Sequence, residues 1–381
     1  MAARIWFAAS SFAVAVVLVL AAVTDHSSEW RRHQERYKER ALAKEKVFSV
    51  RDLVSGMALN VQQYYLAGLN RIDRCATCHL GLQNPKMADE PQPLTTHPGS
   101  LLESHAPQTF GCTVCHGGQG LATTAAAAHG RVPNWEQPLR QSLQIEASCG
   151  TCHDGGRLAG AEHLNAGRVL FAELGCVGCH RVAGRGLDIG PDLSVVASKD
   201  FTGDGRIDSD DWQWNIEHLL DPRSRTPTSI MPKFGLGRDQ ATALVVYLYS
   251  LTGTVIPSAY RPPRRPEIVA ATRVEAGRRV FVEYGCGGCH GHHGEGGLAN
   301  PNSASGGRVP ALAKVKEGYW RDALIKKIGE GVRTEKADPA GPAPPLNMPA
   351  WRGHISAENL DLLVHYLFSL APKSGDDDWD K

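Results

Sequence analysis

Two stretches of the chain repeat each other and decide its fold. GRVLFAELGCVGCH occupies residues 167–180 and GRRVFVEYGCGGCH occupies residues 277–290, an offset of 110 residues. Each copy leads to a Met-Pro pair, in SIMPKFG and in NMPAWRG, and each ends in an apolar segment, ALVVYLYSL or LLVHYLFSL. This repeat predicts two similar domains, each ending in an apolar helix.

All ten cysteines of the 381-residue chain lie in Cys-x-x-Cys-His units. The five units are Cys75, Cys78 and His79; Cys112, Cys115 and His116; Cys149, Cys152 and His153; Cys176, Cys179 and His180; and Cys286, Cys289 and His290. From the chain's own residue frequencies, about 0.01 such units are expected by chance. The two-residue spacer places both thiols on one turn, where they can form thioethers to a porphyrin, and the next residue faces the iron.

Two other uses of paired cysteines fit this pattern less well. A disulfide framework does not explain a histidine after every pair. Structural zinc sites combine the pairs two by two, and five is an odd number. The sequence therefore predicts five covalently attached haem c groups.

The N-terminus carries an apolar segment. Residues 5–24, IWFAASSFAVAVVLVLAAVT, contain no charge and are long enough as a helix to cross a bilayer. We expect an uncleaved transmembrane anchor, with a cleavable signal peptide as the alternative. More basic residues follow the segment than precede it, which opposes an exported C-terminus, but long domains are translocated largely regardless of flanking charge. The charged stretch after it predicts a solvated or membrane-hugging helix.

The fold class predicted from these patterns is mainly α, with a loop-rich three-haem module and two tandem haem domains. Three attachment units spaced by 37 residues leave too little chain for three separate domains, so their haems must pack on one another. The expected segments are an anchor (1–24), a helical spacer (25–70), the three-haem module (71–165), a first domain (166–255), a Pro-rich linker (256–268), a second domain (269–371) and an acidic tail (372–381). A net charge of +1 argues against a nucleic-acid partner.

The two C-terminal copies resemble class I cytochrome c domains, which have a Met-Pro loop some distance after the attachment unit and a closing helix. This resemblance implies that His180 and His290 are proximal iron ligands and that Met231 and Met348 are distal ligands. Residues 71–165 are similar to the N-terminal part of multihaem cytochrome subunits of membrane quinol-oxidising complexes. The resemblance implies attachment of the haems outside the cytoplasm, on the periplasmic or exterior side of a bacterial cytoplasmic membrane.

The first three haems also need distal ligands. His79, His116 and His153 are their proximal ligands, and we expect His97, His105 and His129 to be the distal ones. His163 is the first substitute, and Met87 is another candidate. The sequence does not pair these ligands with particular haems.

Three functions are compatible with these features. We expect an electron-transfer subunit that takes electrons from a membrane quinol-oxidising partner and passes them to a soluble cytochrome or terminal oxidase. Methionine ligation raises the reduction potential, so electrons are expected to run from the bis-His haems to the His/Met haems. The alternatives are a haem enzyme, such as a peroxidase or a small-oxyanion reductase, with one open iron site, and a haem carrier, which covalent attachment disfavours.

One acidic loop adds a further hypothesis. Asp200 to Asp211 places oxygen side chains at positions 1, 3, 5, 9 and 12 of an EF-hand-like loop, with glycine at position 6. Thr202 at position 3 and an aspartate at position 12 depart from that pattern. The loop predicts either a weak Ca²⁺ site or a polar turn that caps a helix over residues 212–220 through Asp208 or Ser209.

Overall fold

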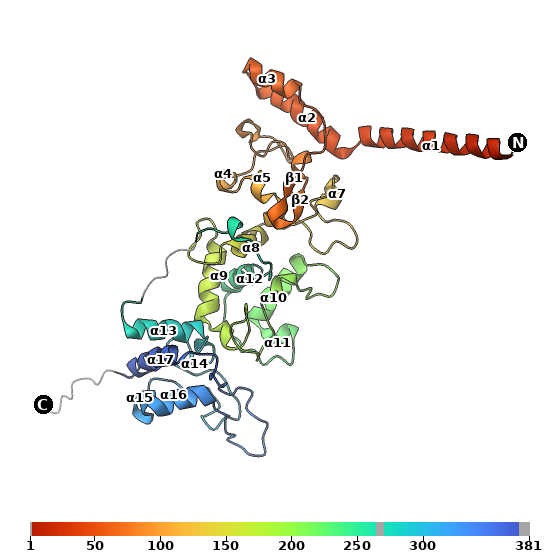
Figure 1. The fold of residues 1–381 in the computed structure, drawn as a ribbon. Helices are drawn as coiled ribbons and strands as arrows, with labels where there is room; N and C mark the ends of the chain where they lie inside the picture. Colours follow the sequence, from red (N-terminus) through yellow and green to blue (C-terminus); the bar gives the residue numbers. More distant parts are fainter. Residues whose placement is uncertain (1, 264–269, 373–381) are drawn as a thin grey trace. The chain divides into compact units, whose positions relative to one another are not determined.

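The computed structural model describes residues 2–263 and 270–372, and within them the chain is mainly helical, as predicted (Figure 1). Parts of the predicted Pro-rich linker and most of the acidic tail lie outside these residues. One antiparallel sheet joins β1 (Tyr64–Leu66) to β2 (Arg71–Asp73), with Tyr64 opposite Asp73. The chain forms two units. The first unit contains residues 1–145, 203–208 and 256–260, and the second contains residues 146–202, 209–255 and 261–381.

The apolar segment forms α1 (Ala2–His26). In the described chain, one N-terminal helix is long and apolar enough to cross a membrane, with a mean hydropathy of 2.4 and no buried residues in its apolar window. Large apolar side chains such as Trp6 and Phe12 are more than 70% exposed. This helix suits either a membrane anchor or a signal sequence.

The charged stretch after α1 forms α2 (Glu29–Lys44) and α3 (Phe48–Ser55). The sequence predicts a solvated or membrane-hugging helix here, and in α2 the residues Trp30, Gln34 and Ala41 are buried. Gln34 is fully buried, and its amide donates to the carbonyl oxygens of Asn60 (2.6 Å) and Thr77 (3.0 Å). Thr77 lies between the first two attachment cysteines, so α2 is tied to the first attachment unit.

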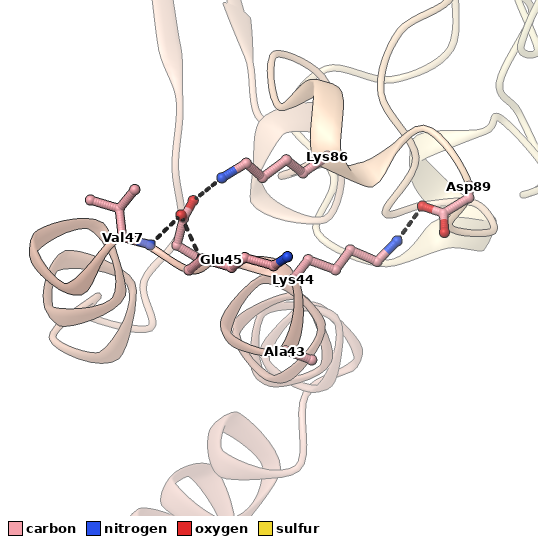
Figure 2. A pocket seen from close by; sticks show the side chains of 7 residues that line it. Ala43, Lys44, Glu45, Val47, Lys86 and Asp89 are labelled. Carbon is pink, nitrogen blue, oxygen red and sulfur yellow. Dashed lines mark hydrogen bonds and ion pairs between the residues drawn. The ribbon is translucent and has the colours of Figure 1, made fainter.

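Ion pairs at the C-terminal end of α2 add to this connection. Figure 2 shows a surface depression there, in which Lys86 Nζ lies 2.6 Å from Glu45 Oε2 and Lys44 pairs with Asp89. Lys44 also lies 2.9 Å from Glu90 Oε1. Ion pairs at a protein surface are individually weak, because water and salt screen them. The ion pairs around the depression therefore connect the end of α2 to the region of the 3₁₀ helix η3 (Pro85–Met87). No predicted haem residue lines the depression.

Short helices and loops make up the rest of the first unit. They are the 3₁₀ helices η1 (Ala67–Leu69), η2 (Cys75–Thr77) and η6 (Ser258–Tyr260), and the α-helices α4 (Leu101–Ser104), α5 (Pro107–Phe110), α6 (Thr113–His116) and α7 (Ala125–Ala128). A small apolar cluster of Ala41, Met87 and Leu94 packs α2 against this region. Such a small cluster leaves the region short of apolar core, which fits a segment whose interior is completed by bound groups.

The second unit contains two similar helix pairs, α9 (Glu162–Glu173) with α12 (Arg238–Leu248) and α13 (Arg273–Glu283) with α17 (Ala357–Ser369). Its other elements are η4 (Cys176–Gly178), η5 (Val196–Ser198), α10 (Ser209–Leu220), α11 (Pro222–Arg225), α14 (Gly287–His290), α15 (Val315–Gly318) and α16 (Arg321–Glu330). The helix α8 (Leu143–Cys152) carries the cysteines of the third Cys-x-x-Cys-His motif. This motif belongs to the second of the two structural units. The three-haem module therefore stays a prediction from sequence spacing.

Each helix pair crosses at a glycine. A Cβ atom on Gly167 would overlap the carbonyl oxygen of Ala243, and one on Gly277 would overlap that of Leu362. An aromatic pair follows each crossing, Phe171 with Tyr247 at 4.9 Å between ring centroids and Phe281 with Tyr366 at 5.3 Å. The sequence repeat thus reappears as a repeated helix crossing that only glycine permits.

This crossing predicts the effect of adding one methyl group. Gly277→Ala forces α13 away from α17, and we expect a loss of about 1–3 kcal/mol in the free energy of unfolding. Gly318→Ala is the matched control, because no atom lies within 4 Å of the Cβ it adds. Urea unfolding of the haem-loaded protein, followed by circular dichroism, measures both. Equal midpoints for the two variants would show that the crossing is not tightly packed.

Candidate haem-binding sites

All five attachment units fold into the same turn. In each, the histidine N–H donates to the carbonyl oxygen of the first cysteine, at 3.0 Å for His79, 2.9 Å for His116, His153 and His180, and 3.0 Å for His290. All ten cysteines are free thiols and partly buried. One turn therefore presents two thiols and one imidazole together, which is the chemistry that covalent haem attachment needs.

Backbone oxygens hold the imidazoles of His180 and His290, the predicted proximal ligands of the second unit. His180 Nδ1 lies 2.8 Å from the carbonyl oxygen of Pro191, and His290 Nδ1 lies 3.2 Å from that of Pro310. A hydrogen bond at Nδ1 fixes the tautomer in which Nε2 is the ligand nitrogen. Burial lowers the pKa of both imidazoles below the ordinary value, and the backbone hydrogen bond only partly opposes it. The neutral form that binds iron is therefore favoured.

Two pairs of imidazoles lie close together in the first unit, one pair tilted and the other nearly perpendicular. The ring centroids of His79 and His129 are 6.4 Å apart, and those of His97 and His116 are 6.3 Å apart. Two imidazoles on opposite faces of one metal, each with a metal–nitrogen bond of about 2 Å and about 1 Å more to the ring centroid, have centroids about 6 Å apart. Both pairs therefore fit a bis-His site, and they combine a proximal histidine with a predicted distal one.

The other distal candidates of the first three haems lie apart from these pairs. His105 belongs to the first unit, where its ring packs on Phe110 at 5.1 Å, whereas His153 belongs to the second. His163 Nδ1 lies 3.2 Å from Glu146 Oε2. Met87 is fully buried in the apolar cluster with Ala41 and Leu94, which is a core position. The distal ligand of the third haem stays a prediction.

The two Met-Pro loops hold their methionines differently. The backbone of Met348 pairs with that of Val332 through hydrogen bonds of 2.8 and 3.0 Å, and its side chain packs on the apolar core around Phe281. The N–H of Met231 donates to Ser229 Oγ at 3.2 Å, in a loop without regular structure. Both side chains are half-buried. Their ligation of iron stays a prediction.

Sequence reasoning missed His218 on α10. Its ring stacks on Trp214, with centroids 5.0 Å apart and planes at 8°, and its Nδ1 is buried with no hydrogen-bond partner among the described residues. Burial lowers the pKa of His218, and the nearby charge of His180 lowers it further. An unsatisfied polar nitrogen near a proximal ligand fits a site that a bound group completes. The i, i+4 spacing of Trp214 and His218 just before the Met-Pro loop was the available signal.

Asp73 joins the first two attachment units. Its fully buried carboxylate accepts hydrogen bonds from the N–H groups of Cys112 (2.7 Å), Thr113 (2.8 Å) and Cys75 (3.1 Å). Burial alone raises the pKa of Asp73, but the hydrogen bonds from the Cys75 side chain and from the three backbone N–H groups outweigh burial, and the pKa falls below its ordinary value. The carboxylate and the thiols of Cys75 and Cys112 lie within 4.8 Å of one another. Both thiols belong to Cys-x-x-Cys-His motifs. We therefore interpret this group as a contact between the first and second of these motifs and not as a separate metal site.

In the acidic loop, the last carboxylate accepts hydrogen bonds from backbone N–H groups. Asp211 is fully buried, and its Oδ1 accepts hydrogen bonds from the N–H groups of Phe201 (2.5 Å) and Thr202 (3.0 Å). The helix α10 begins at Ser209, three residues before the predicted start. The carboxylate at position 12 is thus bound to backbone N–H groups, and both the helix cap through Asp208 or Ser209 and Ca²⁺ binding stay predictions.

Comparisons with known proteins agree with the repeated domains. The cytochrome c family model matches residues 164–252 and 274–371. The chain is 33% identical over 89 residues to cytochrome c oxidase subunit 2 of Alkalihalophilus pseudofirmus, a match that covers 23% of this chain and 25% of that protein. No solved structure matches the chain significantly. The family match implies covalently bound haem c and supports a role in haem-based electron transfer.

The position of Asp73 predicts a selective loss of stability. In Asp73→Asn the amide presents N–H groups to backbone N–H donors, so we expect the free energy of unfolding to fall by roughly 2 kcal/mol or more. Asp192→Asn is the control, because this exposed carboxylate accepts one backbone hydrogen bond, from Ser194. Because the pKa of Asp73 is lowered, its stabilisation is complete above about pH 4 and is lost as the pH falls through the lowered pKa. Thermal unfolding of the haem-loaded proteins at pH 7 and at pH 3 measures both effects, and equal losses in the two variants would contradict the role of Asp73.

Proposed function

We propose that this chain is a membrane-anchored pentahaem c-type cytochrome that carries electrons and has no substrate chemistry of its own. The observation that carries the proposal is the attachment turn, repeated five times with the same backbone hydrogen bond. When bound, haem supplies a one-electron couple between ferric and ferrous iron. The chain's own residues attach that group through two sulfurs, ligate it and limit its contact with water.

The ligands divide the haems into two kinds. We assign His79 with His129 and His116 with His97 as bis-His sites, on the short distances between their rings. We assign His153 as the proximal ligand of the third haem and leave its distal ligand open, with His105 and His163 as the candidates from the sequence. In the cytochrome c segments we assign His180 with Met231 and His290 with Met348. We also place His218 and Trp214 beside the fourth haem, because His218 interacts with His180.

Ligand type gives the proposed direction of transfer. Methionine raises the reduction potential of a haem relative to a second imidazole. Electrons therefore enter at the bis-His sites of the first unit, from a membrane quinol-oxidising partner, and leave from the second unit to a soluble cytochrome or a terminal oxidase. In this proposal α1 anchors the chain in a bacterial cytoplasmic membrane, with the haems in the periplasm or at the cell exterior.

The haem number gives a quantitative test. We expect mass spectrometry of the protein matured in a competent host to show five added haems, and a reductive titration to consume five electrons per chain. The double variant Cys286→Ala, Cys289→Ala should carry four haems and consume four electrons, because each pair of thiols attaches one group. Fewer than five haems on the unaltered chain would contradict the proposal.

Ligand variants test the bis-His sites. We expect His129→Ala and His97→Ala each to convert one haem in five from low spin to high spin, with carbon monoxide binding to the reduced protein only in the variants. His365→Ala is the control, because this histidine is exposed on α17. Absorption and electron paramagnetic resonance spectra measure the spin state. Variants that stay fully low spin would remove both histidines from the ligand set, and carbon monoxide binding by the unaltered protein would favour a haem enzyme.

A further inference from the structure

The fourth and fifth attachment turns meet inside the second unit. A Cβ atom on Gly175 would overlap the backbone nitrogen of Gly288, and one on Gly285 would overlap the backbone nitrogen of Gly178. The two contacts are reciprocal, because the glycine before the first cysteine of each turn meets the glycine before the second cysteine of the other turn. Gly175 and Gly285 also have φ angles of 66° and 69°, which favour glycine over other residues. No side chain at these four positions would let the turns approach so closely.

The attachment sulfurs lie at this contact. The thiols of Cys179 and Cys289 lie within hydrogen-bond reach of each other across this contact. The other two thiols of these turns, Cys176 and Cys286, have pKa values of about 12 because they are buried. One attachment thiol from each turn therefore contacts the other turn.

Contacts around the turns make this a packed interface. Leu187, which follows the fourth attachment unit, is 8% exposed and belongs to the apolar core that contains Val280 and Phe281 of α13. Arg185 lies 3.4 Å from Glu283 Oε1. Side chains of the first cytochrome c segment thus complete the core of the second, so the contact does not depend on the glycines alone.

We propose that the fourth and fifth haems form one directly coupled pair, joined where the Cys179 and Cys289 thioethers meet, and that Gly175, Gly178, Gly285 and Gly288 are the positioning residues. The inference rests on the proposed function, since it requires haem at both turns. A thioether links each sulfur to the edge of its porphyrin, so adjoining sulfurs bring two porphyrin edges together. An exchange at this junction moves one electron from the ferrous to the ferric member, which oxidises one centre, reduces the other and breaks no bond.

Circular dichroism in the Soret region tests the pair, because two coupled porphyrins give a bisignate signal that isolated haems do not. We expect Gly288→Ala to reduce this signal, since the added Cβ would lie 2.6 Å from the carbonyl oxygen of Gly175 and push the turns apart. Gly318→Ala, which meets no atom within 4 Å, should leave the signal unchanged. Haem content is measured on the same samples by mass spectrometry.

A second variant covers the case in which Gly288→Ala does not fold. Leu187→Ala loosens the same interface from its apolar side and should also reduce the bisignate signal, with all five haems attached. Five haems with a signal that neither Gly288→Ala nor Leu187→Ala alters would overturn the coupled pair and leave the proposed function intact. Fewer than five haems on the unaltered chain would instead count against the proposed function.

Discussion

The structure depends on one constraint, the close approach of successive Cys-x-x-Cys-His turns to each other. In the first unit, the Asp73 carboxylate accepts hydrogen bonds from backbone N–H groups of two successive turns and holds Cys75 beside Cys112. In the second unit, glycines perform the same task for the fourth and fifth turns. The two arrangements differ in their physical basis. A buried carboxylate holds two turns together by accepting hydrogen bonds from both, whereas glycines lack the Cβ atoms that would keep two turns apart.

The same constraint connects packing to electron transfer. An electron carrier needs its centres close together and their ligands fixed, so that little rearrangement accompanies each change of oxidation state. Backbone carbonyls hold the rings of His180 and His290, and the rings of His79 and His116 lie close to those of His129 and His97. Burial lowers the pKa of these four imidazoles and so favours their neutral form, the form that can bind a metal. In the proposed function, haem groups complete these sites.

Two features lay beyond sequence reasoning for identifiable reasons. The α2 helix is so rich in charge that its pattern suggested full solvation, yet Gln34 is buried because two carbonyl oxygens satisfy its amide. His218 was overlooked because its spacing from Trp214 is a weak signal, and its burial and its neighbour His180 are set by other segments of the chain. A buried polar group is recognised by its partners, and those partners come from other segments of the chain.

The sequence alone predicted the attachment chemistry, the repeated domains and the mainly helical fold, because a Cys-x-x-Cys-His turn and a helical pattern are made by residues close together in the chain. Only the tertiary structure decided that His129 lies close to His79, that His97 lies close to His116 and that the fourth turn meets the fifth. These contacts join residues far apart in the chain, and several histidines compete for each position with the same local chemistry. Distance in space, which packing sets, is what distinguishes them.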